Sequence, residues 1–425
     1  MIDTLSTKVN NIAVIGAGAS GLFAAAKALE CGAKVTVFER NDIVGKKLNI
    51  SGNGKCNFAN LESDAGHYRN PDFIKPYLHQ YDANRYVKYF ASLGILSYAE
   101  KNGCLYPASQ KAQSITNGLV HYIEQIGGLI CCGVCISEIN KNEQDKFVLS
   151  SKEKELLGVY DAVILACGGK AAPKTGSDGY AFRLARGFGH TVSRTYPVLV
   201  QLKSSSSVCK SCAGIRSRVT AAAYINNELI RKEAGELQIT EYGLSGIVTF
   251  NLSRVLTKAI EEGEKCSIHI DFLPELPTEE IYDFLINRFH LLKQDSLFHF
   301  FEGLFNPKLL TTLLAEQKLN PNQTISSVDI PFLSELLAGF KNWIFPLTGH
   351  NGYENAQATH GGILIGEIAD NLESKLVSNL YFAGEMLDID ADCGGYNLHW
   401  AWISGEIAGT NAAGKGFVHD SDKSI

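Results

Sequence analysis

Short apolar runs alternate with helix-like stretches over the first part of the chain. Residues 11–15 (NIAVI) form an apolar run that ends in glycines, as buried parallel strands do. Residues 20–30 are rich in alanine and end shortly before a glycine, which favours a helix, and residues 34–38 (KVTVF) form a second apolar run. This order predicts a β-α-β unit.

The same alternation continues to about residue 196, with a glycine- and asparagine-rich loop at 45–60. We expect helices within 71–94, 109–127 and 179–187, and strands at 134–139, 146–150 and 160–166.

The pattern changes beyond Pro197. Residues 198–275 alternate between apolar and polar positions with polar turns between them, which favours an antiparallel sheet, and residues 277–340 have helical periodicity. After Trp343 the first pattern returns, with a strand at 379–383 and a helix at 395–408. The sequence therefore predicts a nucleotide-binding domain that is split by an insertion.

Composition narrows the classes of protein. The chain has 425 residues, 45% of them hydrophobic and 20% charged, which is typical of a globular protein with a core. Its net charge of -6 provides no basic field, so we expect no nucleic-acid partner. It has neither a signal-peptide pattern nor about 18 consecutive apolar residues, so we expect no membrane span and a cytoplasmic location. Composition leaves the oligomeric state open.

Eleven cysteines leave the redox chemistry open. Two pairs have CxxC spacing, Cys132/Cys135 and Cys209/Cys212, and two such pairs are compatible with zinc or with a redox disulfide. The first pair lies in a predicted strand, where neighbouring side chains alternate between faces. We therefore expect buried reduced thiols and no metal site.

The strongest chemical motif is GAGASG at residues 16–21, which follows a predicted strand and opens a predicted helix. Gly16 permits the tight turn, Gly18 allows the backbone to approach a pyrophosphate, and Gly21 allows close packing of helix and strand. Free N–H groups at the helix start bind phosphate. Glu39 ends the next strand, where an acid binds ribose hydroxyls and disfavours a 2′-phosphate, so FAD or NAD is expected rather than NADP.

Three later segments favour FAD over NAD. They are the polar loop SGNGKCN at 51–57, the strand end ACGG at 166–169, and LYFAGEMLD at 380–388, a strand that runs into a glycine and an acid. An extended FAD molecule needs support at both ends, and a C-terminal strand that returns beside the first motif provides it.

Several stretches together resemble the BaiN/RdsA-type NAD(P)/FAD-dependent oxidoreductases, a family of flavoproteins with two dinucleotide-binding domains. They are AVIGAGASGLFAA, GKKLNISGNGKCNFAN, LACGGKAAPKTGSDGYAFRLARGFGH, GELQITEYGLSG, ATHGGILIGEI and LYFAGEMLDIDADCGGYNLHWAWISGEIAG. The chain departs from the family at Lys55, where arginine is typical, and at His399, where glutamine is frequent.

The resemblance implies an α/β fold. A Rossmann-like FAD-binding domain formed by 1–196 and 345–425 would be interrupted by a β-barrel-like subdomain and a small helical subdomain. The barrel would comprise 197–276, with 330–344 as a candidate closing segment, and the helical subdomain 277–340.

The resemblance also implies site residues. Glu39 would bind the adenosine ribose, Val134 the adenine by its backbone, and Ser51, Cys56 and Asn57 would line the flavin. With the glycine motifs, the expected FAD-binding set is Gly16, Gly18, Ala19, Ser20, Gly21, Glu39, Arg40, Lys47, Ser51, Gly54, Cys56, Asn57, Val134, Gly168, Gly384, Glu385, Asp388, Gly395, Tyr396, Asn397 and Leu398.

The helix that opens at 394–398 (GGYNL) is of mechanistic interest. Its N-terminal N–H groups would face the flavin N1/O2 edge, where negative charge gathers on reduction, and would favour the reduced flavin. Asp388 would bind the ribityl chain, unless it caps a turn.

The family points to transfer of hydride from NADH through flavin to a conjugated C=C bond, with a proton added at the α-carbon. An activity within it is the reduction of ring double bonds in oxidised bile acids, so a steroid-like enone is the expected substrate, bound between the flavin domain and the insertion. Acid candidates are Tyr396, His399 and Tyr242, with His360 less favoured. Cys56 and Cys393 are nucleophile candidates for which packing is the preferred role.

Three other functions remain open from the sequence. The first is an amine or hydroxy-acid oxidase that reduces O2. The second is an RNA-modifying flavoprotein, which the net charge of -6 disfavours. The third is a flavin-binding protein without catalysis.

Overall fold

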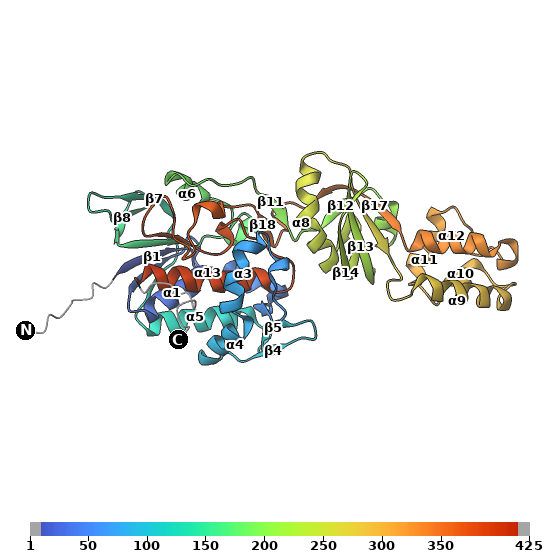
Figure 1. The fold of residues 1–425 in the computed structure, drawn as a ribbon, viewed down its shortest axis with the longest axis horizontal. Helices are drawn as coiled ribbons and strands as arrows, with labels where there is room; N and C mark the ends of the chain where they lie inside the picture. The colour runs from blue at the N-terminus through green and yellow to red at the C-terminus, as the bar shows by residue number, and fades with distance from the viewer. Residues whose placement is uncertain (1–9, 415–425) are drawn as a thin grey trace, which may run out of the picture. The chain divides into compact units, whose positions relative to one another are not determined.

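The computed structural model describes residues 10–414 and forms two compact units. Unit 1 contains the chain up to Pro197 and again from Gln357, and unit 2 is Val198–Ala356 (Figure 1). Each unit has its own hydrophobic core.

A five-stranded sheet with the order β19-β10-β1-β2-β6 is the centre of unit 1, and all its pairings are parallel. The strands are β1 Asn11–Ile15, β2 Lys34–Phe38, β6 Leu129–Cys131, β10 Ala162–Leu165 and β19 Leu380–Phe382. Most of their side chains are buried, as expected for a sheet covered on both faces. The register pairs Ile15 with Leu165 and Leu165 with Phe382, so the carboxyl ends of the central strands meet at one edge.

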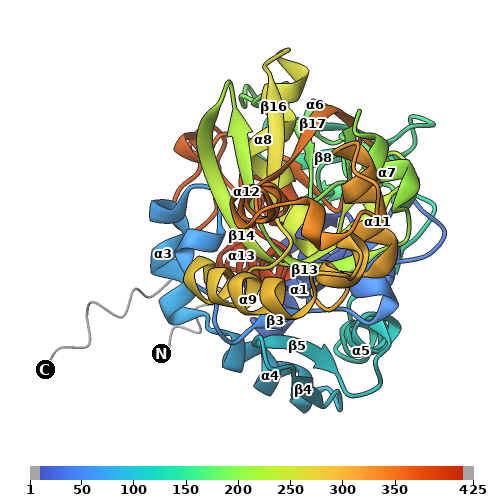
Figure 2. The same cartoon turned by 90° about the vertical axis from the view of Figure 1, so that its right-hand side faces the viewer.

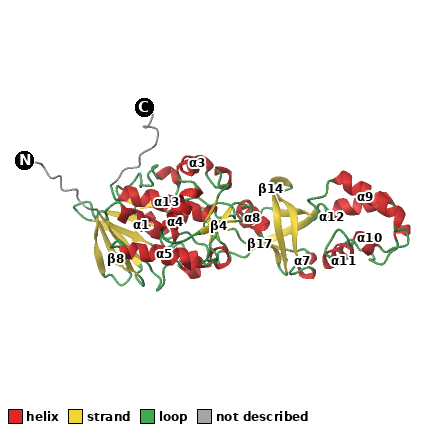
Figure 3. Ribbon diagram, turned by 90° about the horizontal axis from the view of Figure 1, so that it is seen from below, coloured by secondary structure: helices red, strands yellow, loops and turns green. Residues whose placement is uncertain are grey.

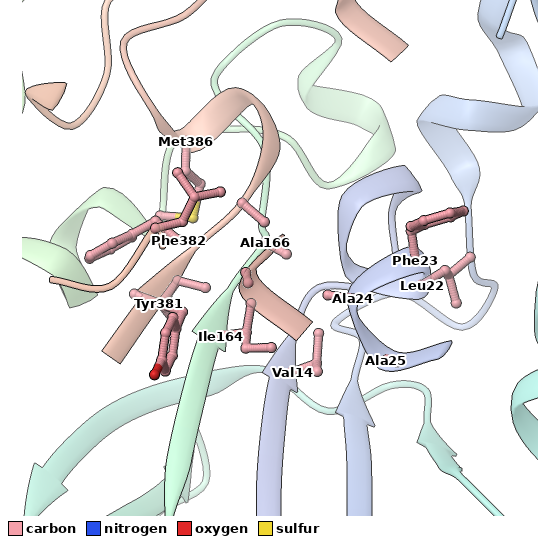
Figure 4. Close-up of a cluster of buried hydrophobic side chains, with 14 of the residues drawn as sticks. Val14, Leu22, Phe23, Ala24, Ala25, Ile164, Ala166, Tyr381, Phe382 and Met386 are labelled. Carbon is pink, nitrogen blue, oxygen red and sulfur yellow. The ribbon is translucent and has the colours of Figure 1, made fainter. Parts of the chain in front are cut away.

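Helices α1 Ala19–Glu30 and α13 Tyr396–Ala412 pack closely together on this sheet. A methyl group on Gly405 would lie 2.6 Å from the Ser20 carbonyl oxygen, and one on Gly409 would lie 2.3 Å from that of Ala24. Glycine at both positions lets the two helix backbones approach. Figure 4 shows Leu22 to Ala25 of α1 near Val14 of β1 and Ile164 of β10.

Shorter elements complete unit 1. Its other helices are α2 Lys46–Ile50, α3 Pro71–Gln80, α4 Ala83–Ser92, α5 Ala112–Gln125 and α6 Phe182–Gly187, with 3-10 turns at Ser51–Gly54, Ala65–His67, Pro173–Thr175, Ile365–Glu367 and Gly384–Met386. Its smaller sheets are β3 Ala59–Asn60, β5 Cys104–Pro107 and β4 Ser97–Ala99, then β7 Ile136–Lys141, β8 Phe147–Ser151 and β9 Leu156–Tyr160. Strands β11 Tyr196–Val198 and β18 Ala358–His360 pair where the chain leaves unit 1 and returns.

Unit 2 contains a closed barrel with the strand order β12-β15-β14-β13-β16-β17 (Figure 2). The strands are β12 Leu202–Ser204, β13 Arg216–Ile225, β14 Glu228–Thr240, β15 Gly243–Ser245, β16 Cys266–Asp271 and β17 Trp343–His350. In the sequence, helix α7 Ser207–Ser211 lies between β12 and β13, and helix α8 Ile247–Glu261 lies between β15 and β16. Figure 3 shows a separate helical layer, which consists of α9 Thr278–Leu291, α10 Leu297–Phe301, α11 Pro307–Glu316 and α12 Ile330–Phe340, with a 3-10 turn at Ile325–Ser327.

The structure differs from the sequence-based boundaries at three places. Strand β17 belongs to the barrel, so the return to unit 1 comes at Gln357 and not at residue 345. The segment that closes the barrel is 343–350, because residues 330–340 form α12. Helix α8 interrupts the stretch predicted to be only antiparallel sheet.

The cysteines of both CxxC pairs form no disulfide, and Cys209 and Cys212 are buried as expected. Cys132, in contrast, is exposed and Cys135 half-buried, so the expectation of buried thiols is wrong for the first pair. Cys132 lies in a turn after β6, where Gly133 has φ +75°, and not in a strand as predicted. Between residues 10 and 414, no three His, Cys, Asp or Glu side chains form a group that could hold a metal ion. No helix in the described part of the chain is both long and apolar enough to cross a membrane.

Candidate functional site

The three glycines of residues 16–21 have different surroundings. A methyl group on Gly16 would lie 2.7 Å from the Ala166 carbonyl oxygen, and one on Gly21 would lie 1.9 Å from the carbonyl oxygen of Gly16. A methyl group on Gly18, in contrast, would have no atom within 4 Å. Gly16 and Gly21 are therefore required by packing, whereas Gly18 borders open space.

Open space at Gly18 lies at the start of helix α1. Gly18 is the N-cap residue, no side chain caps the helix, and its first turn contains no acidic residue. The N–H groups of Ala19 and Ser20 at the first turn, with the positive end of the helix dipole, therefore suit an anion such as a pyrophosphate.

Glu39 follows β2, and its side chain is held firmly. Its Oε2 accepts a hydrogen bond from the Ala17 N–H at 2.9 Å, and its Oε1 accepts from the Asn41 N–H at 2.9 Å. The Val134 N–H donates to the Glu39 carbonyl oxygen. Glu39 thus connects the glycine turn to the turn before β7. Asn41 Nδ2 also donates to Oε1 at 2.6 Å, so Oε2, with one hydrogen bond, is the oxygen that retains acceptor capacity for a ribose hydroxyl.

Arg40 and Gly168 flank this region. Arg40 is exposed and donates to Asp178 Oδ1 at 2.8 Å, and this hydrogen bond raises the pKa of the guanidinium. Gly168 has φ +73°, and a methyl group there would lie 2.9 Å from Ser177 Oγ. Both residues therefore contact the segment 177–178.

The end of β19 returns to the first glycine turn. Gly384 has φ +71°, and a methyl group on it would lie 2.5 Å from Ser20 Oγ. Its N–H donates to Ser404 Oγ at 2.8 Å. The next residue, Glu385, forms an ion pair with Lys47 through Oε2, while its buried Oε1 has no hydrogen-bond partner among the described residues.

The loop 51–57 lies beside the start of α13. Ser51 Oγ donates to the Leu48 carbonyl oxygen and so ends α2, and Gly54 has φ +81°. Cys56 has φ +61° and is 0% exposed, and burial raises the pKa of its thiol to about 12. The buried Asn57 Oδ1 has no hydrogen-bond partner in the described chain. Lys55, at the family's arginine position, is exposed.

Helix α13 begins at a glycine pair. Gly395 has φ +97°, and a methyl group on it would lie 2.5 Å from the Ala59 carbonyl oxygen. Asn397 closes the preceding turn, since its Oδ1 accepts from the Ala391 N–H and its Nδ2 donates to the Ala391 carbonyl oxygen. No side chain caps the helix, and its first turn carries no acid. Leu398 is half-buried beside this turn.

Of the predicted acids, His399 is placed where it cannot act on a substrate. It is 0% exposed, and its Nε2–H donates to the Tyr81 carbonyl oxygen at 2.9 Å. Burial lowers its pKa to about 4, so it is neutral. We therefore correct its assignment to a core residue. Tyr242 is 43% exposed in unit 2, in the turn before β15.

Tyr396 and His360 remain near the α13 turn. Burial raises the pKa of Tyr396 to about 12, and its ring stacks on His67 with centroids 4.2 Å apart. His360 is engaged at both ring nitrogens, by Asp390 Oδ2 at 3.0 Å from Nδ1 and by the Arg69 guanidinium at Nε2.

Asp388 lies in a buried ionic cluster. Arg69 Nε lies 2.8 Å from Asp388 Oδ1, and Ser193 Oγ donates to Asp388 Oδ2 at 3.4 Å. The carboxylate is 5% exposed. A contact with a ribityl hydroxyl would therefore compete with, or add to, the pairing with Arg69.

Sequence reasoning missed four residues of this region: Asn41, His67, Arg69 and Asp392. The segment HYRN at 67–70 lies between elements and carries no motif. A polar loop with a histidine, a tyrosine and an arginine in succession was the available signal. Its importance comes from its pairing with residues 388–392, which the sequence does not show.

The parallel sheet with glycine turns at its carboxyl edge, interrupted by a barrel, defines a Rossmann-type dinucleotide-binding fold of the flavoprotein class, as predicted. Residues 10–411 match the family model described as HI0933-like protein Rossmann domain, and the chain belongs to this family.

Curated relatives extend over nearly the whole chain. A 3-dehydro-bile acid delta(4,6)-reductase of Clostridium scindens is 35% identical over 95% of this chain and 99% of its own length. A ribosomal RNA dihydrouridine synthase of Haemophilus influenzae is 30% identical over 92% of this chain and 95% of its own. These matches confirm the family resemblance inferred from the sequence.

Among solved structures, the 3-ketosteroid delta1-dehydrogenase of Sterolibacterium denitrificans has the same fold. The TM-score is 0.51 at 11% identity, and the match covers 96% of this chain and 100% of the other.

Proposed function

We propose that this protein is an FAD-dependent reductase of C=C bonds conjugated to a carbonyl group, with NADH as the electron donor and a steroid-like enone such as an oxidised bile acid as the substrate. The observation that carries the proposal is the 35% identity, over 95% of the chain, to a reductase named for that chemistry. The Rossmann-type fold is compatible with an oxidoreductase and does not specify the substrate.

The residues present fit FAD on three observations. The space at Gly18 is open and faces an uncapped helix start. Two buried acceptor atoms, Asn57 Oδ1 and Glu385 Oε1, have no hydrogen-bond partner between residues 10 and 414. Glu39 is anchored at the end of β2, where ribose hydroxyls are bound in this fold. A flavin, when bound, supplies the hydride acceptor and donor.

Each end of the cofactor would be held by different means. Ala19 and Ser20 at the start of α1 would bind the pyrophosphate, and Glu39 and Val134 would hold the adenosine. Lys47, Glu385 and Asn57 would contact the ribityl and ring end. The proximity of Gly384, after β19, to Ser20 Oγ supports this division, because it brings the end of β19 beside the first glycine turn.

The start of α13 would tune the flavin ring. Its first N–H groups, at Tyr396, Asn397 and Leu398, carry the positive end of the helix dipole, and no side-chain carboxylate neutralises them in the first turn. A helix start directed at a ring that gains negative charge on reduction stabilises the reduced state. The chain would thereby favour the form that transfers hydride to an enone.

A second candidate substrate is a uridine of ribosomal RNA, because a relative at 30% identity is named for dihydrouridine synthesis. The uracil C5=C6 bond is also conjugated to a carbonyl, so the same hydride and proton additions would serve. The expected absence of a nucleic-acid partner thus has no support from the comparisons. We favour the enone because the chain's net charge of -6 provides no basic field for the phosphates of RNA.

An anaerobic stopped-flow experiment tests the proposal. The protein is loaded with FAD, reduced with NADH, and mixed with 3-oxo-steroid dienes, simple enones, ribosomal RNA or O2. Fast oxidation of the flavin by an enone, with slow oxidation by O2, supports the reductase. RNA turnover appears as a mass gain of two hydrogens at uridine.

Other outcomes assign the protein elsewhere. Fast oxidation by O2 together with no response to enones or RNA indicates an oxidase. A flavin that NADH and NADPH both fail to reduce indicates a flavin-binding protein without this catalysis. Either result would contradict the proposed reductase activity.

A further inference from the structure

Two distant segments of unit 1 pair beside the start of α13. The Arg69 N–H donates to the Asp390 carbonyl oxygen at 2.8 Å, and the Asp392 N–H donates to the His67 carbonyl oxygen at 3.0 Å. Between them, Tyr68 forms an antiparallel bridge with Ala391. Residues 67–69 and 390–392 therefore run as a short two-stranded ladder, which we call the HYR ladder.

Neighbouring side chains of the HYR ladder point to opposite faces, as they do on extended segments in general. His67 pairs with Asp392 and Arg69 with Asp388, while Tyr68 points elsewhere and donates from its hydroxyl to the Tyr396 carbonyl oxygen at 3.2 Å. The ladder is thus tied to the first residue of α13.

His67 has the geometry of an oriented imidazole. Its Nδ1 lies 3.2 Å from Asp392 Oδ2, and the Asp392 side chain is 5% exposed. Its ring stacks on Tyr396 with an interplanar angle of 11° and a centroid distance of 4.2 Å. The His67 side chain is 37% exposed, so protons reach it from solvent.

We propose that His67 is the general acid of the reduction, and that Asp392 is its positioning residue. This rests on the proposed function. Asp392 accepts a hydrogen bond from Nδ1–H, so the imidazolium form of His67 has the Nε2 proton to transfer and is left as the neutral Nδ1–H tautomer. This is the arrangement by which a carboxylate fixes a catalytic imidazole.

NADH would be the source of the hydride in this reduction. A bound flavin would supply the hydride for a new C–H bond at the enone β-carbon, and the C=C electron pair would move onto the α-carbon and carbonyl oxygen. The Nε2–H bond of the His67 imidazolium would then break as a C–H bond forms at the α-carbon, which leaves neutral His67 with its Nδ1–H on Asp392. Solvent reprotonates His67, and the net change is addition of one hydride and one proton.

The other titratable groups nearby suit this role less well. His360 receives a hydrogen bond from Arg69 at Nε2, since arginine only donates, so its remaining proton points at Asp390. His399 is sealed in the core. Burial raises the pKa of Cys393 to about 11. Tyr396 is the closest competitor, and one variant separates it from His67.

The test measures each half-reaction in FAD-loaded protein. We expect His67→Gln to slow oxidation of the reduced flavin by the enone by about 100-fold, within the usual contribution of a general acid. Asp392→Asn slows it by about tenfold. Reduction of the flavin by NADH and the Kd for FAD stay within about twofold of the wild type, because neither involves this proton.

Two readouts separate acid catalysis from support of the fold. In D2O, wild-type product carries α-deuterium on one face, whereas the His67→Gln product loses this selectivity. In the protein without FAD, 15N NMR of His67 shows Nδ1–H as the dominant tautomer, and Asp392→Asn shifts that balance. His67→Asn is the reserve variant if His67→Gln misfolds.

Two controls bracket the result. His79→Gln changes an exposed histidine of α3 and leaves both half-reactions unchanged. Tyr396→Phe keeps the ring under His67 and removes the hydroxyl. Slow enone turnover in Tyr396→Phe with normal turnover in His67→Gln would overturn the assignment in favour of Tyr396.

The two hypotheses fail in different ways. If wild-type protein transfers hydride to an enone and His67→Gln does so within threefold of its rate, only the role of His67 is rejected. If the reduced wild-type flavin is oxidised by no enone and no RNA, the proposed function is rejected and the role of His67 falls with it.

Discussion

Helices α1 and α13 both begin at a glycine without a side-chain cap or an acid in the first turn. Their caps differ in conformation. Gly18 has φ -83° and ψ -168°, which any residue adopts, whereas Gly395 has φ +97°, in the left-handed region. Their surroundings differ too. A methyl group meets nothing within 4 Å at Gly18 and lies 2.5 Å from the Ala59 carbonyl oxygen at Gly395.

The same residue type therefore has two purposes at these helix starts. At Gly395 the protein itself needs glycine, because backbone conformation and packing both exclude a side chain. At Gly18 the protein alone does not need it, and the open space there suits the close approach of a ligand. Substitutions that separate stability from FAD binding test this distinction.

Gly21→Ala should give the largest effect, since its methyl group would lie 1.9 Å from the carbonyl oxygen of Gly16. No side chain can rotate away there, so helix and strand must separate. We expect a loss of about 4 kcal/mol or more in the free energy of unfolding, measured by urea titration. Gly187→Ala, in α6 with no atom within 4 Å, is the matched control and should be neutral or stabilising. Equal stability of the two variants would contradict the packing argument.

The second largest loss of stability is expected from protonation of His399, which lies in the first turn of α13. Burial lowers its folded-state pKa to about 4 from the unfolded value near 6.5. As the pH falls, the unfolded chain therefore binds a proton before the folded chain does. The contribution of neutral His399 to the free energy of unfolding is complete above pH 6.5 and is lost as the pH falls towards 4. Because one pKa unit corresponds to about 1.36 kcal/mol, the free energy of unfolding should fall by about 3 kcal/mol.

Urea unfolding between pH 7.5 and pH 4 measures that loss. His399→Gln retains a donor for the Tyr81 carbonyl oxygen and removes the titration, so its stability should fall less with acid. His79→Gln, which removes an exposed histidine, should follow the wild-type curve. Parallel curves for wild type and His399→Gln would show that His399 is not the buried base.

The strands and helices of unit 1 show which features of the fold could be predicted from the sequence. The strands around residues 11–15 and 34–38 and the Rossmann class were predictable, because short apolar runs of this kind, separated by a helix-forming stretch, are typical of buried parallel strands. The split of the domain was visible as a change of pattern, but its end was not. Residues 343–350 alternate like any strand, and only pairing with β12 and β16 assigns them to the barrel.

Site residues divide in the same way. Local motifs located Gly18 and Gly395, and the first motif predicted that Gly18 leaves room for a pyrophosphate. Nothing local showed that Gly395 packs against Ala59. His399 was a plausible acid by position, and only tertiary packing shows it to be buried. His67 carries no motif, since its partner Asp392 is distant in sequence and is brought near by the HYR ladder.

Gly395→Ala should have the third effect, about 2 kcal/mol of lost stability, from a non-glycine φ of +97° and the contact with Ala59. Gly32→Ala isolates the first cause, because Gly32 has φ +87° and no atom within 4 Å. We expect Gly395→Ala to lose more stability in urea unfolding than Gly32→Ala. If the two lose the same amount, the packing at α13 contributes nothing.

Gly18→Ala should have the smallest effect, and it falls on binding rather than on folding. Its φ and ψ suit alanine and its methyl group meets no protein atom, so the free energy of unfolding without FAD should stay within about 0.5 kcal/mol of the wild type. The methyl group would occupy the approach of a pyrophosphate to the α1 start, and we expect about tenfold weaker FAD binding, or about 1.4 kcal/mol, by fluorescence titration. Gly395→Ala gives the opposite pattern, with stability lost before FAD is added. Unchanged FAD affinity in a stable Gly18→Ala variant would mean that the open glycine does not face the cofactor, and the contrast between the two helix starts would then need another cause.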